Sequence, residues 1–333
     1  TVEESAQAGF LDGPRVLSNM AVDRWIPSRF AHLSDRLVTQ NGILLMAVAS
    51  LAILAATRGN VGFLMVLYSI NVFITFTLSQ LGMVVHWFRE RKAGRRWLRP
   101  LIVSGLGCGL SAFILCFVVV EKFAAGGWLT LAVTLGFAGI ALLVKRHYQG
   151  THMLSGRLDT LVKAAGIPDT ADPPTPVHPD PKSRTAVLLV NGWNGLGLHS
   201  LFSILRLHGD FYENFVILHV GLLDAGTFKG VDEIDALRSH TGSETDRYVR
   251  YLHANGRRAE GRWTVHADVV EALEELACET ARDYPRSVFF GGQLVFRQEG
   301  LWTRLLHNNV VFAIQRRLYL RGLPFMLLPA RVD

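Results

Sequence analysis

Long uncharged stretches dominate the first 150 residues of the chain. The longest, residues 59–88, holds thirty residues without an Asp, Glu, Lys or Arg. That exceeds the roughly 20 apolar residues needed to cross the hydrocarbon core of a bilayer. Three more stretches of this kind cover residues 37–57, 100–120 and 123–144. The pattern predicts four membrane spans, at about residues 42–58, 61–88, 100–121 and 126–145.

The spans define a predicted transmembrane domain over residues 1–148, an all-α helix bundle that begins with the tail of one further span. We expect that tail to end at Gly13-Pro14, because proline cannot donate the hydrogen bond that continues a helix. Between Arg15 and Arg36 we expect a surface loop, in which the run from Phe30 to Leu33 forms a short interfacial helix.

The second span carries a polar stripe. Tyr68, Asn71, Thr75 and Ser79 recur every three or four residues, which places them on one face of a helix. Polar groups exposed to hydrocarbon are costly, so this face must turn toward protein or water. Two hypotheses stay open: the face lines a transport pathway, or it supplies hydrogen bonds that hold helices together.

A proline-rich segment marks a change of composition. Six of the twelve prolines lie between Gly166 and Pro181, which predicts a linker over residues 149–183. Beyond it, apolar runs such as residues 185–191 alternate with helical patterns. This alternation predicts a cytoplasmic α/β domain over residues 184–333, with a five-stranded, mostly parallel sheet.

The distribution of charge predicts the orientation in the membrane. Residues 1–150 contain 14 Lys and Arg against 7 Asp and Glu, whereas residues 151–333 contain 20 against 21. Of the 14 basic residues, 12 lie in the segments 15–36, 89–99 and 145–146. By the positive-inside rule these segments are cytoplasmic. We expect a protein of the inner (plasma) membrane whose C-terminal domain is cytoplasmic, and no nucleic acid partner.

Asp12 and Arg15 are candidates for a gate at the end of the first helix. They lie three residues apart, so an ion pair between them is one hypothesis, and a solvated carboxylate at a helix end is the other. None of the four uncharged stretches contains a carboxylate, although proton coupling usually needs an ionisable residue within the membrane. We therefore expect the coupling acid to lie outside this chain.

A glycine-rich turn follows the first predicted strand and contains Asn191, Gly192, Gly195 and Gly197. Backbone N–H groups at a helix start can hold a phosphate, so a regulatory nucleotide is possible here. A tight strand-to-helix turn would need the same glycines. We expect no other cofactor, no metal site and no enzymatic activity, because the chain has no metal-ligand spacing of cysteines and no recognisable catalytic motif.

Several motifs resemble the amino acid–polyamine–organocation (APC) superfamily of transporters. The loop after the eighth span of that family has a "D-x-P-R" stretch followed by an "A-x-D-x-x-x-P-x-x-F" stretch. The corresponding residues here are Asp12-Gly13-Pro14-Arg15, then Ala21-Val22-Asp23-Arg24-Trp25-Ile26-Pro27, then Phe30. The runs Leu78-Ser79-Gln80-Leu81-Gly82-Met83-Val84 and Val190-Asn191-Gly192-Trp193-Asn194-Gly195 extend the similarity to a KimA-like branch of potassium–proton symporters.

This resemblance implies the C-terminal half of a secondary active transporter that works by alternating access. The chain would hold the end of span 8, spans 9–12 and a domain resembling universal stress proteins. Potassium–proton symport is the expected function, an amino acid permease the first alternative, and a membrane-anchored α/β sensor the second. The implied partners are the lipid bilayer, a small cation or amino acid as substrate, and a second copy of the chain in a homodimer.

Overall fold

The computed structural model describes residues 2–33, 39–91, 97–158, 178–224, 231–296 and 309–332. Most of the predicted linker, residues 159–177, lies outside them. The chain divides into two compact units, one made of residues 1–44 together with 143–333 and the other of residues 45–142.

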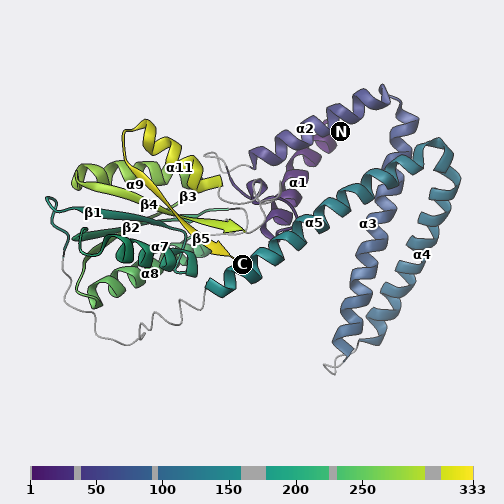
Figure 1. The fold of residues 1–333 in the computed structure, drawn as a ribbon. Helices are drawn as coiled ribbons and strands as arrows, with labels where there is room; N and C mark the ends of the chain where they lie inside the picture. The colour runs from purple at the N-terminus through teal and green to yellow at the C-terminus, as the bar shows by residue number, and fades with distance from the viewer. Residues whose placement is uncertain are drawn as a thin grey trace. The chain divides into compact units, whose positions relative to one another are not determined.

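The first half of the chain consists of long helices (Figure 1). They are α1 (Val2–Val22), α2 (Gln40–Thr57), α3 (Val61–Glu90), α4 (Leu98–Lys122) and α5 (Trp128–Leu158). Within the described residues, four segments are long and apolar enough to cross a membrane: Gln40–Thr57, Val61–Glu90, Leu98–Lys122 and Trp128–Gly150. The predicted series of four helices long and apolar enough to span a membrane is therefore confirmed.

The predicted end of the first helix is wrong. Helix α1 continues through Pro14 and ends at Val22. Pro14 is buried, and a Cβ atom built on Gly42 of α2 would lie 3.0 Å from the Pro14 Cβ. A proline removes one helical hydrogen bond, and packing against a second helix offsets that loss. Pro14 is thus a contact between α1 and α2 where a helix end was expected.

Helices α3 and α4 lie side by side within the second unit (Figure 1). Their approach uses Gly107, since a Cβ there would lie 3.3 Å from the side chain of Gln80. The Cys108 thiol donates a hydrogen bond to the backbone oxygen of Thr77, with Sγ 3.9 Å from that oxygen. Cys108 is therefore a packing residue.

A π-helical turn, Phe123–Gly127, joins α4 to α5 without a separate loop. Gly126 adopts φ +107°, a conformation that favours glycine, and a side chain there would overlap the ring of Phe63. Gly126 thus forms a kink between two helices, at a position where the sequence predicted only a short break between two spans.

The C-terminal domain contains a five-stranded sheet in the order β3-β2-β1-β4-β5, with every neighbouring pair parallel. The strands are β1 (Thr185–Val190), β2 (Asn214–Leu222), β3 (Arg258–His266), β4 (Ser287–Phe296) and β5 (Phe325–Val332). The predicted α/β fold class is confirmed.

Helices cover both faces of this sheet (Figure 1). Helices α7 (Gly195–His208) and α8 (Val231–Ala254) pack on one face, and α9 (Val269–Asp283) and α11 (Asn309–Leu320) pack on the other. Leu188 of β1 belongs to the core beneath α7 and α8, while its neighbour Val187 belongs to the core beneath α9 and α11. Burial on both faces explains why β1 is a continuous apolar run.

The order of the strands creates a switch point between β1 and β4. From β1 the chain moves through α7 to β2 on one side, and β4 then returns to the other side of β1. Connections that diverge in this way leave a crevice at the carboxyl ends of the strands, where open α/β sheets bind ligands.

Gly197 in the first turn of α7 tests this packing. A Cβ atom there would overlap the Tyr248 hydroxyl, which donates a 2.9 Å hydrogen bond to the Gly192 oxygen. We expect Gly197→Ala to destabilise the domain by about 1–3 kcal/mol through overpacking. Measured by thermal unfolding, the loss of stability in the double variant with Tyr248→Phe should be smaller than the sum of the losses in the two single variants, because the clashing oxygen is gone. Additive losses would contradict this account.

Candidate functional site

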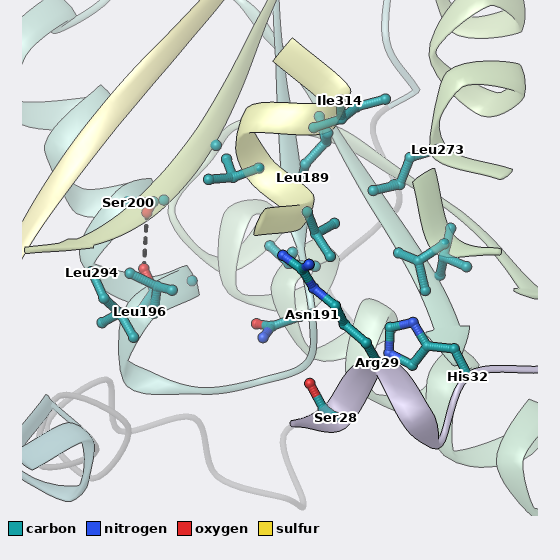
Figure 2. A pocket seen from close by; sticks show the side chains of 18 residues that line it. Ser28, Arg29, His32, Leu189, Asn191, Leu196, Ser200, Leu273, Leu294 and Ile314 are labelled. Carbon is teal, nitrogen blue, oxygen red and sulfur yellow. Dashed lines mark hydrogen bonds between the residues drawn. The ribbon is translucent and has the colours of Figure 1, made fainter. Parts of the chain in front are cut away.

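A cavity of about 350 Å³ lies at the carboxyl ends of β1 and β4, at the switch point of the sheet (Figure 2). We call it the carboxyl-edge cavity. Its lining residues from the α/β domain come from the strand ends and from the first two turns of the covering helices; they include Leu189, Asn191, Gly197, Ser200, Leu273, Gly291, Gly292, Leu294 and Ile314. The lining is mainly apolar.

The remaining wall of the cavity comes from a segment far away in the sequence. Ser28, Arg29 and His32, from the loop that follows α1, complete the lining. Figure 2 shows the Arg29 side chain extending from its turn into the cavity. A few polar groups in an otherwise apolar cavity are typical of sites for small amphipathic molecules.

The loop contacts the α/β domain through a β-bridge. Residues Ser28–Phe30 form a single 3-10 turn, and His32 then pairs antiparallel with Asp224, directly beyond β2. The flanking residues Ala31 and Leu33 are buried, with 3% and 7% of their surfaces exposed. The sequence predicted an interfacial helix from Phe30 to Leu33, and in the structure a 3-10 turn ends at Phe30 and leads into this bridge. The apolar Ala31 and Leu33 within a basic loop were the signal for burial.

His32 is partly buried in this contact, and burial lowers its pKa. The nearby carboxylates of Asp224 and Asp268 oppose the decrease, and Arg29 adds to it. Because the net pKa is below the ordinary value of about 6.5, the imidazole is neutral at neutral pH. The bridge therefore does not depend on a charged histidine.

The glycine-rich turn is only partly at the cavity. Asn191 and Gly197 line it, whereas Gly192 and Gly195 do not. Gly192 adopts φ +130°, and a Cβ there would lie 2.9 Å from a carboxylate oxygen of Glu244. The tight turn thus accounts for this glycine without a ligand.

The start of α7 already has a capping residue. The Asn194 side chain accepts a 3.0 Å hydrogen bond from the Gly197 N–H and donates one of 2.9 Å to the Asn191 side-chain oxygen. A phosphate placed at this helix start would compete with Asn194 for the same donor. Nucleotide binding at Asn191, Gly192, Gly195 and Gly197 stays a prediction.

A second histidine, His219, lies in the core beneath α8. Its Nδ1 is 3.1 Å from the Thr245 hydroxyl oxygen, and that hydroxyl donates to the Thr241 oxygen. The Thr241 backbone oxygen, 3.2 Å from Nδ1, can also only accept, so in the neutral ring the proton lies on Nδ1. Burial also lowers the pKa of His219. No sequence motif singled out His219, and its role here is structural.

No group of three or more His, Cys, Asp or Glu side chains that could hold a metal ion occurs within the described ranges. The carboxyl-edge cavity instead offers an arginine, hydroxyl and amide groups, and apolar walls. Such a set suits hydrogen bonding and apolar contact.

The four residues of the polar stripe lie on an exposed side of α3; the exposed fraction of Tyr68 is 72%. Asn71 bridges two helices, because its side-chain oxygen accepts a 3.1 Å hydrogen bond from the Thr134 hydroxyl of α5. The Thr75 hydroxyl donates to the Asn71 backbone oxygen at 2.9 Å. Both hypotheses for the stripe have a physical basis: Asn71 holds helices together, and the face as a whole is open.

Asp12 and Arg15 are both exposed on α1. Among the described ion pairs, none joins these two side chains. The structure brings neither residue into the carboxyl-edge cavity. Their role at a gate stays a prediction.

Comparisons with known proteins agree with the resemblance of the sequence. Residues 5–140 match the family model described as amino acid permease. The chain is 32% identical over 148 residues to the potassium transporter KimA of Bacillus subtilis (strain 168). This alignment covers 43% of this chain and 23% of that protein. The chain thus spans about a quarter of the length of this relative.

The fold of part of the chain is also similar to a crystal structure of a protein from the universal stress protein family of Burkholderia pseudomallei. The sequence identity is 19%, and the alignment covers 46% of this chain and 100% of that one with a TM-score of 0.32. At this score the similarity carries no inference about function. Residues 5–140, about two-fifths of the chain, are similar to the amino acid permease family.

Proposed function

We propose that this chain is the C-terminal half of a secondary active transporter that carries potassium together with protons by alternating access. The observation that supports potassium is the 32% identity to a potassium transporter. The four membrane-spanning segments and the permease family match support transport in general. The carboxylates of the four membrane-spanning segments, Glu90 and Glu121, lie at helix ends, so the proposed carboxylate for proton coupling lies on another span.

Amino acid transport is the second candidate, because the matching family model bears that description. A membrane-anchored sensor has less support, since the match to permeases covers the membrane helices themselves. In either transporter, the exposed polar face of α3 would turn toward protein or water in a bilayer. Tyr68, Asn71, Thr75 and Ser79 on that face, and Asp12 and Arg15 on α1, are the residues we propose for the pathway or gate.

The α/β domain is proposed to regulate or assemble the transporter from the cytoplasmic side, as part of a homodimer. The β-bridge between His32 and Asp224 supports a common side for the α1–α2 loop and this domain. Four spans between them would return the chain to the side where it started. The basic loops favour the cytoplasm for that side.

Ion uptake tests the proposed function directly. The full-length protein that contains this chain should restore growth at low potassium to a bacterium that lacks its own uptake systems. Purified and reconstituted protein should acidify the lumen of vesicles when potassium is supplied outside. Uptake of a radiolabelled amino acid without any potassium flux would favour the second candidate and overturn the first.

Asn71 separates the two hypotheses for the polar stripe. Replacing Asn71 by Leu removes the hydrogen bond to Thr134, which is worth about 0.6 kcal/mol on average within membranes. If the face lines a pathway, transport should fall much further than this small loss of stability explains. Val72→Leu on the neighbouring face is the matched control. Equal transport by both variants would leave Asn71 with a packing role only.

Cysteine labelling tests the orientation. In a background without other cysteines, Asn60→Cys before α3 should react with an impermeant thiol reagent in intact cells, because the loop after α2 is expected outside. Lys182→Cys, exposed before β1, should react only after permeabilisation. Labelling at position 182 in intact cells would reverse the assignment drawn from the basic loops.

A further inference from the structure

The loop from Trp25 to Leu33, which we call the strap, contacts three long helices. It follows the end of α1, and it contacts the start of α2 and the last residues of the membrane-spanning segment of α5, Trp128–Gly150. The Asn41 side chain, at the start of α2, donates a 3.0 Å hydrogen bond to the Arg29 backbone oxygen. On α5, the Lys145 ammonium group lies 3.5 Å from the centre of the Trp25 ring. A cation over an indole ring contributes about 0.5–1 kcal/mol at an exposed site.

A further bond fixes the turn of the strap to α5. The Ser28 N–H donates to the Tyr148 hydroxyl oxygen at 3.4 Å. The contacts at Trp25, Ser28 and Arg29 are three successive attachments to α2 and α5. These three contacts join the first part of the strap to the membrane helices, although Ser28 and Arg29 also line the carboxyl-edge cavity.

The second part of the strap belongs to the α/β domain. His32 pairs with Asp224 beyond β2, and Ala31 and Leu33 on either side are buried. The Arg29 side chain lies in the carboxyl-edge cavity while its backbone oxygen binds α2. Adjacent residues of one short segment therefore contact two different parts of the chain.

We propose that the strap is an intrachain regulatory contact, which in its docked state restrains the end of α1, the start of α2 and α5 at Lys145 and Tyr148, and slows transport. This inference rests on the proposed function, because alternating access requires helices to move relative to one another. While the bridge to Asp224 is closed, these parts of the helices cannot move independently of the α/β domain. Release of the strap frees them, and docking holds them in one arrangement.

A reversible disulfide tests the proposal in the full-length protein. Residues paired across a β-bridge have Cα atoms about 4.5–5.5 Å apart, which is within the range that a disulfide spans. In a background without other cysteines, His32→Cys with Asp224→Cys should crosslink under a mild oxidant. The control pair is His32→Cys with Asp210→Cys. Asp210 precedes the amino end of β2, whereas Asp224 follows its carboxyl end, so the control pair should not crosslink.

Transport is measured in the reduced, oxidised and re-reduced states of the same sample. We expect oxidation to reduce potassium uptake at least fivefold and reduction to restore it, with no change in the control pair. A release variant, Leu33→Ser, should raise uptake above that of the wild type. The change places a polar hydroxyl where the apolar Leu33 side chain is buried, which weakens docking of the strap.

Each other outcome is decisive. A folded double variant that does not crosslink, or one that crosslinks without any change in uptake, overturns the proposal. A crosslinked product of twice the mass would show that the strap docks on a second copy, which also overturns the intrachain contact. If the wild-type protein and the reduced variant both fail to take up potassium, the proposed function fails instead, and the crosslink alone then decides whether the strap docks within one chain.

Discussion

Hydrocarbon offers no hydrogen bonds, and the membrane half of this chain is organised around that constraint. Polar side chains in α3 bond to their own helix, as the hydroxyl of Thr77 does to the oxygen of Phe73 at 2.7 Å, or to a neighbouring helix, as Asn71 does. The kink at Gly126 joins two spans within five residues, Phe123–Gly127. Pro14, which lacks one donor, is buried against Gly42 of a second helix. Each feature limits the number of polar groups left without a partner.

The α/β domain follows a different constraint, namely burial on both faces of a parallel sheet. Apolar residues alternate between two cores along β1, and glycines allow helices to approach at the turns. The crevice at the carboxyl ends then follows from the order of the strands. Here the crevice is not fully open, because Arg29 of the strap extends into it. Ligand binding in the cavity and docking of the strap would therefore involve the same surface.

The features that depend on local pattern were predictable from the sequence. Uncharged stretches gave the membrane-spanning helices, and the alternation of apolar runs with helical patterns gave the parallel sheet. The end of α1 was not predictable, because the contact that lets the helix continue past Pro14 lies in a distant segment at Gly42. The strap was missed for the same reason, since no local property of Asp224 indicates a pairing with His32. The position of the glycine-rich turn was also predictable. The sequence could not show whether its glycines bind a ligand or are needed because Tyr248 and Glu244 pack against them.

The bridge between His32 and Asp224 has a consequence for the order of assembly. Every membrane-spanning segment described here lies between these two residues in the sequence. Closing so long a loop costs chain entropy that only the finished surfaces repay, so the contact forms after both of its sides have folded. During synthesis the strap emerges before the four membrane-spanning segments, and Asp224 emerges after them. If the four segments cross a bilayer, the bridge can close only when the strap and Asp224 lie on the same side of it.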